Sequence, residues 1–376
     1  MIPVCVPWLP GNEVKYATEA IKTGWISGES GVYIKKFEES FAKYCGVKYG
    51  IACCNGSAAL HMACAALNLK RGDEVIVTTF TNIASINGII LTGATPVLID
   101  IAPDTWNIEP TKIEEKITTK TKAIMVVHIY GHPCDMDPII ELTKKYKLYL
   151  IEDVAEAHGA EYKGRKCGSM SDISCFSFYA NKVLTTGEGG MCLTDNEVFA
   201  DRLRKLRNLY FGIPRYVHER VGFNYRMTNV QAAIGCAQVE NADMLVNARR
   251  SVGLKYNKML ENVKELIFPV EKPYAKNVYW MYGVVLDDNC KLTKEEVMKK
   301  MEEKGIGVRS FFMPMNQQPA FVNKTIENAP DCSGNFPVAD KISERGFYLP
   351  SSSNLSDEEI LEVCKALKAI VTSSTG

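Results

Sequence analysis

The chain has 376 residues, of which 46% are hydrophobic and 23% charged, so it can bury a large core and form two domains like an ordinary globular protein. Lys plus Arg and Asp plus Glu number 44 each, and this balance argues against a nucleic-acid partner. No apolar run approaches the roughly 20 residues that span a bilayer, and the first residues lack the pattern of a signal peptide. We therefore expect a cytoplasmic protein with no membrane partner.

The first half of the chain alternates short apolar runs with helical segments. This alternation is typical of crossover units, which build a largely parallel and buried sheet. The expected strands are 49–53, 74–78, 95–100, 123–128, 148–152, 173–178 and 190–194. The expected helices are 12–23, 32–44, 58–67, 81–91, 138–146 and 197–210.

The second half has a different pattern, typical of a smaller α+β domain. Residues 228–264 form one long helical stretch that we expect to be broken once. Strands are predicted at 278–286 and 308–311, and helices at 293–304 and 360–371. With a boundary near Val246, the chain divides into a large domain of residues 1–245 and a small domain of residues 246–376.

Two residues that follow apolar runs suggest a cofactor site. Asp153 closes the run YLIED, and Lys182 follows the predicted strand 173–178 and precedes a stretch of small residues. A pyridoxal phosphate enzyme needs a lysine that forms a Schiff base and a carboxylate that keeps the pyridine nitrogen protonated. By spacing alone, Lys182 could equally be a solvated loop lysine and Asp153 a helix cap.

Two further positions occupy places where ligands of α/β proteins collect. Gly56 and Ser57 lie in a strand-to-helix turn, where free N–H groups and the helix dipole favour a phosphate, although Ser57 could be a plain N-cap. Phe80 follows the strand 74–78 at its carboxyl end. A single Phe in that position is more often a core residue.

Several longer motifs resemble one known family. Residues 153–160 (DVAEAHGA), 177–178 (SF), 181–182 (NK) and 186–190 (TGEGG) are similar to the DegT/DnrJ/StrS sugar aminotransferases, and the likeness extends from about Pro7 to past Arg345. The resemblance implies an α/β, aspartate-aminotransferase-like fold (fold type I), with a mostly parallel mixed sheet in the large domain and a smaller C-terminal α+β domain. It also implies pyridoxal 5'-phosphate (PLP) as cofactor, with pyridoxamine 5'-phosphate (PMP) as the intermediate form.

The same resemblance implies roles for individual residues. Lys182 is the catalytic residue, which binds the cofactor covalently and then acts as a general base. Asp153 faces the pyridine nitrogen, where a neighbouring cation is expected to lower its pKa. His158 either packs against the cofactor, which we favour, or fills the core. The implied cofactor-binding residues are Gly56, Ser57, Phe80, Asp153, Glu156, Ser177, Lys182 and Asn224.

Asn224 is expected to act in a neighbouring subunit. Residues 221–228 (VGFNYRMT) resemble the segment with which the family crosses to its partner, and there Asn224 would bond the partner's cofactor phosphate. A homodimer with shared active sites follows from this reading. Without the resemblance, Asn224 is simply a turn residue.

The resemblance also suggests the substrates, L-glutamate and a nucleotide-linked ketosugar. Residues 6–8 and the loop 23–27 are most similar to members that aminate C4 of a GDP-linked 4-keto-6-deoxymannose, which makes Trp8, Trp25 and Ser27 predicted substrate contacts. UDP- and dTDP-linked 4-ketosugars remain open. Three basic residues either contact the diphosphate or lie on the surface, namely Arg215, His218 and Arg309.

Two other kinds of function stay as alternatives. A PLP-dependent lyase or dehydratase shares the fold, but the family's sugar dehydratases carry histidine in place of Lys182. A non-catalytic regulatory protein would not need Asp153, Ser177 and Lys182 intact.

Thirteen cysteines are scattered through mostly apolar stretches without a CxxC pair, so we expect small buried thiols in a reducing compartment. His128, His132 and Cys134 lie close in sequence, but their surroundings suggest a strand-to-loop exit, and we expect no metal.

Overall fold

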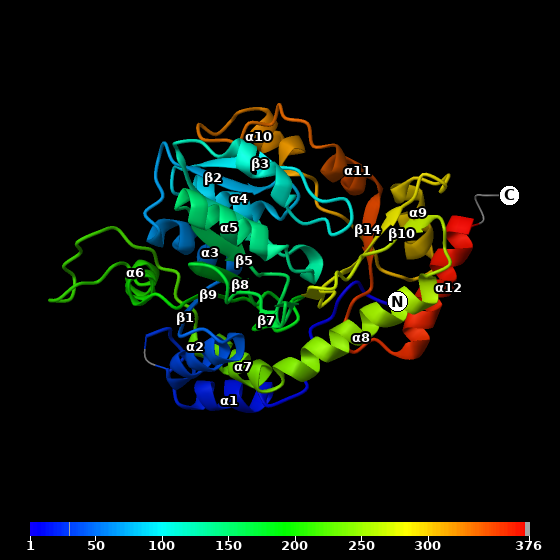
Figure 1. The fold of residues 1–376 in the computed structure, drawn as a ribbon. Helices are drawn as coiled ribbons and strands as arrows, with labels where there is room; N and C mark the ends of the chain where they lie inside the picture. The colour runs from blue at the N-terminus through cyan, green and yellow to red at the C-terminus, as the bar shows by residue number, and fades with distance from the viewer. Residues whose placement is uncertain (30, 373–376) are drawn as a thin grey trace.

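The computed structural model describes residues 1–29 and 31–372. Its centre is a seven-stranded sheet in the order β1-β9-β8-β5-β4-β2-β3 (Figure 1). β9 runs antiparallel to both of its neighbours, β1 and β8, and all other neighbouring strands are parallel. The sheet is therefore mixed but mostly parallel, as predicted. The strands are β1 (Tyr49–Cys53), β2 (Glu74–Thr78), β3 (Thr95–Ile99), β4 (Thr121–Val127), β5 (Tyr149–Asp153), β8 (Ile173–Ser177) and β9 (Gly190–Thr194).

Helices cover both faces of this sheet, which explains why its strands are near-continuous apolar runs. Along β4, Ile124 and Val126 pack in the same cluster as Ile139 of α5, whereas Met125 packs in the other cluster with α3 and α4. The alternation follows from the two-residue period of a strand. The helices are α3 (Gly56–Ala66), α4 (Ile83–Ile90), α5 (Met136–Tyr146) and α6 (Glu197–Arg207).

A layer of three helices lies beside β1. α7 (Asn229–Glu240) packs against both α1 (Glu13–Lys22) and α2 (Val32–Cys45), and α2 covers β1 (Figure 1). α7 starts with a capping box, in which the Thr228 and Gln231 side chains each accept from the other's backbone N–H. The predicted break in the long helical stretch is present at Asn241.

α8 (Ala242–Leu260) leads to the second part of the molecule (Figure 1), so the predicted boundary at Val246 falls inside a continuous helix. The second part is an antiparallel sheet in the order β10-β12-β14-β13, packed against α8, α9 and α12. Ile2 pairs with Ile306 and packs in this core. The elements are β10 (Leu266–Ile267), β12 (Tyr282–Leu286), α9 (Lys294–Glu303), β13 (Arg309–Ser310), β14 (Gly346–Leu349) and α12 (Asp357–Thr372).

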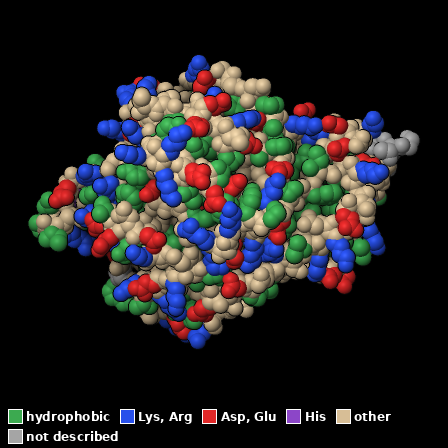
Figure 2. All heavy atoms as spheres, in the orientation of Figure 1, with side chains coloured by type: hydrophobic (Ala, Val, Ile, Leu, Met, Phe, Trp, Pro, Cys, Tyr) green, Lys and Arg blue, Asp and Glu red, His purple; other side chains and the backbone are tan. Residues whose placement is uncertain are grey.

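Smaller elements join the two parts. The remaining strands form a three-stranded sheet, β11 (Ala275–Lys276), β6 (Glu161–Tyr162) and β7 (Arg165–Lys166). The remaining helices are α10 (Pro319–Val322) and α11 (Pro337–Arg345), with 3-10 turns at Pro110–Lys112, Glu114–Lys116, Ile129–Gly131 and Met315–Gln317. None of the described helices combines the length and apolar character that a bilayer crossing requires. Acidic and basic side chains are intermixed over the face shown in Figure 2.

Candidate active site

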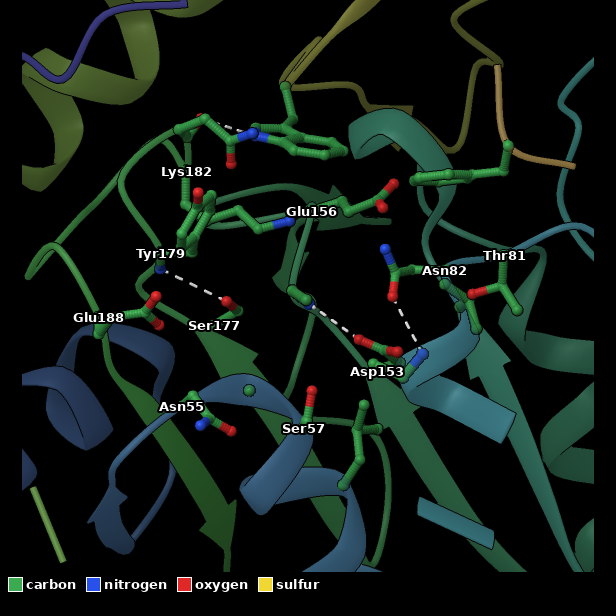
Figure 3. A pocket seen from close by; sticks show the side chains of 18 of the residues that line it. Asn55, Ser57, Thr81, Asn82, Asp153, Glu156, Ser177, Tyr179, Lys182 and Glu188 are labelled. Atoms are coloured by element: carbon green, nitrogen blue, oxygen red, sulfur yellow. Dashed lines mark hydrogen bonds between the residues drawn. The ribbon is translucent and has the colours of Figure 1, made fainter. Parts of the chain in front are cut away.

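A pocket of about 400 Å³ lies where the carboxyl ends of β5 and β8 meet the first turns of α3 and α4 (Figure 3). This is the edge at which α/β sheets bind ligands. Residues of the second sheet close it from the other side, among them Arg309 and Tyr348. Six predicted site residues line this pocket together: Gly56, Ser57, Asp153, Glu156, Ser177 and Lys182.

One end of the pocket is a cradle of neutral donors. α3 begins at Gly56, and its N-cap is Asn55, whose side chain accepts from the Ala58 N–H at 2.8 Å. Ser57 is therefore not the cap, and its hydroxyl lies in the pocket beside that of Ser177 (Figure 3). A Cβ on Gly56 would lie 2.7 Å from Cβ of Ser177, so only glycine fits the turn. Free N–H groups, two hydroxyls and the positive end of a helix suit a phosphate.

Asp153 ends β5 at the floor of the pocket. Its Oδ2 accepts from the Ser85 hydroxyl at 2.7 Å and its Oδ1 from the Ala155 N–H at 3.1 Å. Burial raises the pKa of Asp153, and these two hydrogen bonds and the charge of Lys182 oppose that shift. The lowered pKa predicted from the sequence requires the cation of the cofactor beside this carboxylate, and it stays a prediction.

Glu156 and Lys182 influence one another's ionisation. Glu156 Oε2 accepts from the Tyr130 N–H at 2.7 Å, and burial raises the pKa of Glu156 to about 7 against the attraction of Lys182. Burial lowers the pKa of Lys182, while Glu156 and Asp153 raise it. Lys182 Nζ lies 3.6 Å from the centroid of the Trp280 ring. A half-buried lysine whose pKa is lowered in this way reaches its neutral, nucleophilic form more readily than an exposed one.

Phe80 and His158, for which a cofactor contact was predicted, are fully buried and do not line the pocket of the cofactor-free chain. Phe80 is fully buried, edge-on to Tyr130 with ring centroids 6.0 Å apart, and its neighbours Thr81 and Asn82 line the pocket in its place. His158 is fully buried among phenylalanine rings, and burial lowers its pKa to about 3.

Four other predicted residues do not line this pocket. Asn224 is exposed and its backbone pairs with Asn208. Trp25 is 59% exposed, Ser27 is exposed and Trp8 is half-buried. They lie outside the lining of this chain's pocket.

Of the three basic residues considered for diphosphate binding, one lies in the pocket and two lie on the surface. Arg309 lines the pocket. Arg215 pairs with Glu29 at the surface, 3.3 Å away, and His218 Nδ1 lies 2.8 Å from the Leu209 carbonyl oxygen on an exposed loop.

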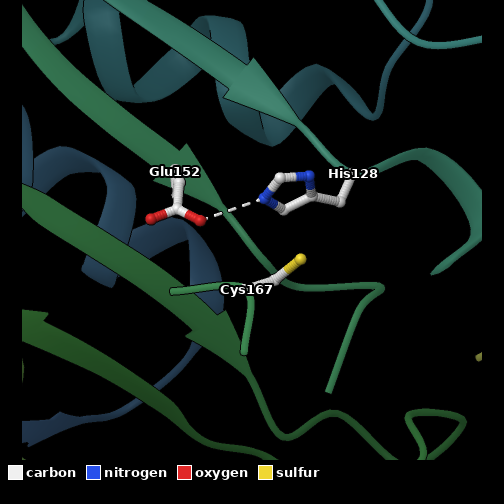
Figure 4. A group of neighbouring side chains, drawn as sticks. All are labelled: His128, Glu152 and Cys167. Atoms are coloured by element: carbon white, nitrogen blue, oxygen red, sulfur yellow. Dashed lines mark hydrogen bonds and ion pairs between the residues drawn. The ribbon is translucent and has the colours of Figure 1, made fainter. Parts of the chain in front are cut away.

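A buried group of His128, Glu152 and Cys167 has the donor types of a metal site (Figure 4). His128 Nδ1 accepts from the Cys134 N–H at 3.0 Å, so its proton is on Nε2, which donates to Glu152 at 3.2 Å. Glu152 also accepts from the N–H groups of Gly168 and Met170. Both imidazole nitrogens are therefore engaged, and the His128–Glu152 pair ties the end of β4 and β5 to the loop that contains Gly168 and Met170.

Sequence reasoning missed several lining residues, notably Thr81, Tyr179, Glu188, Trp280 and Tyr348. Trp280 and Tyr348 come from the second sheet region, and no local pattern links them to Lys182. Thr81 lies at the start of the predicted helix 81–91, but no motif distinguishes it there, and the fold alone brings it to the pocket.

A sequence model of the DegT/DnrJ/EryC1/StrS aminotransferase family matches residues 9–368. The chain belongs to this family. It is 43% identical over 375 residues to GDP-perosamine synthase of Caulobacter vibrioides, covering 98% of each chain. It is 41% identical over 367 residues to GDP-perosamine synthase of Escherichia coli O157:H7, covering 97% of each. The structure of Spr1654 from Streptococcus pneumoniae in its PLP form, described as a sugar aminotransferase, matches with a TM-score of 0.91 and 25% identity over 99% of each chain.

This aminotransferase is therefore PLP-dependent, with the aspartate-aminotransferase-like fold that the sequence predicted. The pocket suits PLP in its own right. It offers a phosphate cradle whose Gly56 leaves no room for a side chain, a buried carboxylate at Asp153 and a half-buried lysine at Lys182.

Proposed function

We propose that the protein transfers the amino group of L-glutamate to C4 of a nucleotide-linked 4-keto-6-deoxyhexose. The preferred acceptor is GDP-4-keto-6-deoxymannose, which gives GDP-perosamine. The observation that carries the proposal is the convergence of Lys182, Asp153 and the cradle at Gly56 in one pocket. Near full-length similarity to two GDP-perosamine synthases supports the choice of sugar.

In this proposal each pocket residue has one task. Gly56, Ser57 and Ser177 hold the cofactor phosphate, and Asp153 holds the proton of the pyridine nitrogen. PLP supplies an electron-accepting ring that carries the amino group between the two substrates. Lys182 binds the cofactor between reactions and moves a proton at the substrate carbon when it is free.

Glu156 is proposed to contact the ring hydroxyl. Because burial raises its pKa to about 7, its carboxyl group is partly protonated near neutral pH and can donate as well as accept a hydrogen bond. The Tyr130 N–H holds the other oxygen in place at 2.7 Å.

We propose that the working enzyme is a homodimer in which Asn224 completes the partner's site. Asn224 belongs to the connection between α6 and α7, which projects from the body of the molecule (Figure 1). This connection carries exposed apolar side chains, including Ile213 and Val221, which are 100% and 87% exposed. Large exposed apolar side chains on a projecting segment favour an interface.

Trp25 and Ser27 are proposed to act at the same interface, with Trp8 nearer the pocket. The loop that carries them is bonded to the start of α7, directly after the crossing segment 221–228, because the Ile26 carbonyl accepts from the Asn229 N–H at 3.0 Å. The Asn229 side chain also donates to the Trp25 carbonyl at 2.7 Å. A partner's substrate would then meet both segments together.

A panel of GDP-, UDP- and dTDP-linked 4-ketosugars, each with L-glutamate as donor, tests the substrate. Amination of the GDP sugar at the highest kcat/KM supports the proposal, and a clear preference for a UDP or dTDP sugar replaces it with that alternative. Loss of the sugar's oxygen without gain of nitrogen would indicate a dehydratase. Absence of any absorbance change on adding glutamate would indicate a non-catalytic protein.

We also propose that the protein works in the cytosol. All thirteen cysteines are unpaired and ten of them are buried, which suits a reducing compartment.

A further inference from the structure

Two hydrogen bonds hold Trp280 beside Lys182, one at its side chain and one at its backbone. Its Nε1–H donates to the carbonyl oxygen of Asn181 at 2.8 Å, and Asn181 is the residue before Lys182. The backbone carbonyl oxygen of Trp280 accepts from Arg249 Nη1 at 2.5 Å. The side chain lines the pocket but is only 4% exposed. The face of the ring is therefore held in one place under the Lys182 ammonium.

Arg249 fixes Trp280 without bringing an acid into the site. It lies on α8 and is 2% exposed. Its other donors reach the Ser353 hydroxyl at 3.0 Å and the Cys5 sulfur at 3.6 Å. None of these partners is a carboxylate that could compete with the ring for Lys182.

The carboxylates that face Lys182 are occupied elsewhere. Asp153 accepts from Ser85 and Ala155, and Glu156 accepts from the Tyr130 N–H. In the described part of the chain, the Lys182 ammonium makes neither a hydrogen bond nor an ion pair, and its close contact is the ring at 3.6 Å. The other titratable or charged groups around Lys182 are Cys5, His158, Glu188, Arg249, Arg309, Tyr179 and Tyr348.

We propose that the face of the Trp280 ring is the docking surface of the Lys182 ammonium whenever Lys182 is not bonded to the cofactor. An aromatic face attracts a cation but cannot take its proton, so it holds the charged lysine in reach of the cofactor and releases it without breaking an ion pair. Trp280 is thus a positioning residue for Lys182. The inference rests on the proposed role of Lys182.

The test uses the enzyme converted to its PMP form with L-glutamate, in which Lys182 is free. The rate at which Lys182 reacts with an amine-specific reagent is followed across pH by peptide mass spectrometry, and its midpoint gives the lysine pKa. Trp280→Leu is expected to lower that pKa by about one unit, about tenfold in the acid constant, because the buried ring face is lost. Trp280→Phe keeps a face and is expected to shift it much less.

An unchanged pKa in Trp280→Leu would overturn the inference, and so would an equal shift in Trp280→Phe, which would assign the effect to the Nε1–H bond instead.

A second measurement leaves the packing intact. Tryptophans with increasing numbers of ring fluorines weaken the negative face at nearly constant shape, so the Lys182 pKa should fall stepwise with each fluorine. The matched control is Trp280→Phe grown on the same fluorotryptophans, in which the other three tryptophans are still replaced and no trend is expected. A flat response in the wild-type chain would overturn the inference whether or not the leucine variant folds.

Borohydride reduction of the PLP form separates this inference from the proposed function. If the reduced cofactor is attached to another lysine, the role proposed for Lys182 fails. If it is attached to Lys182 and the lysine pKa is independent of the ring, only the docking role of Trp280 fails.

Discussion

The Ser85 hydroxyl donates a hydrogen bond to Asp153 across 2.7 Å, and both residues are buried. A serine has one hydroxyl proton, so the contact of 2.8 Å between Ser85 and Thr81 must be donated by Thr81. The two hydroxyls form a directed relay from Thr81, just before α4, through Ser85 on α4 to the carboxylate. The relay stabilises the charged form of Asp153 against the burial that raises its pKa.

Ser85→Ala is expected to lower turnover several-fold and to reduce the unfolding free energy by about 1–3 kcal/mol, because a buried carboxylate loses a donor. Steady-state kinetics and urea unfolding measure the two effects. Ser174→Ala is the matched control, since the Ser174 hydroxyl is equally buried but donates to the neutral carbonyl of Gly168. Equal loss of activity in both variants would show that Ser85 has no special relation to Asp153.

Lys182→Ala is expected to abolish turnover while leaving a folded protein that still binds the cofactor and the sugar. General base catalysis alone contributes about 10²–10⁴-fold, and the covalent role adds to it. Residual activity above roughly one part in a thousand would contradict the assignment. Lys145→Ala removes a surface lysine outside the pocket and should behave as the wild type.

Asp153→Asn is expected to bind the cofactor but to lose most activity, since an amide cannot keep the pyridine nitrogen protonated. Asp172→Asn is a suitable control, because the Asp172 carboxylate accepts from the Leu150 N–H outside the pocket. Turnover of Asp153→Asn close to the wild-type value would mean that another group holds the proton.

Glu156 should make the stability of the cofactor-free protein depend on pH. Its pKa of about 7 in the folded protein lies above the usual 4.5, so the folded state binds the proton more tightly than the unfolded state. The resulting stability is fully present below pH 4.5 and is lost as the pH rises through 7. Between pH 4.5 and 7 the unfolding free energy of the wild type should fall by on the order of 3 kcal/mol relative to that of Glu156→Gln, as measured by urea unfolding. Parallel curves for the two proteins would mean that Glu156 stays ionised.

Shared active sites predict complementation between two inactive chains. Lys182→Ala mixed with Asn224→Asp should regain activity, because one site of the mixed dimer carries neither change. Aspartate is chosen since its charge repels a phosphate. The check is an activity assay after subunit exchange, confirmed by mass spectrometry. Exchange without activity, or full activity of Asn224→Asp alone, would refute the shared site.

The fold and the centre of the site were accessible from the sequence because their signals are local. Strands such as 49–53 and 190–194 are apolar runs whose ends coincide with the observed β1 and β9. Residues 153–160 and 181–190 carry the lysine and the carboxylates in short motifs. The single break expected in the helical stretch 228–264 is present, and the structure places it at Asn241 between α7 and α8.

What the sequence did not predict depends on packing between distant segments. The strand predicted at 278–286 begins only at Tyr282, because Tyr279 has a left-handed φ of 49° in the turn that brings Trp280 to Lys182. Phe80 lies at a ligand-binding edge by sequence, but its orientation is set by Tyr130 and Phe312. Likewise the pKa of Asp153 follows from burial, which no spacing reveals.

The pairing of Ile2 with Ile306 has a consequence for the order of assembly. The Ile2 N–H donates to the Gly305 carbonyl at 2.8 Å, and the Ser351 N–H donates to the Val4 carbonyl at 2.7 Å. During synthesis the segment 2–6 leaves the ribosome long before these partners exist. The large sheet can form first, whereas the second sheet must wait for almost the whole chain. A ribosome stalled before residue 305 would thus carry a nascent chain with an ordered β1–β9 sheet and an undocked amino-terminal segment, open to protease at residues that are later protected.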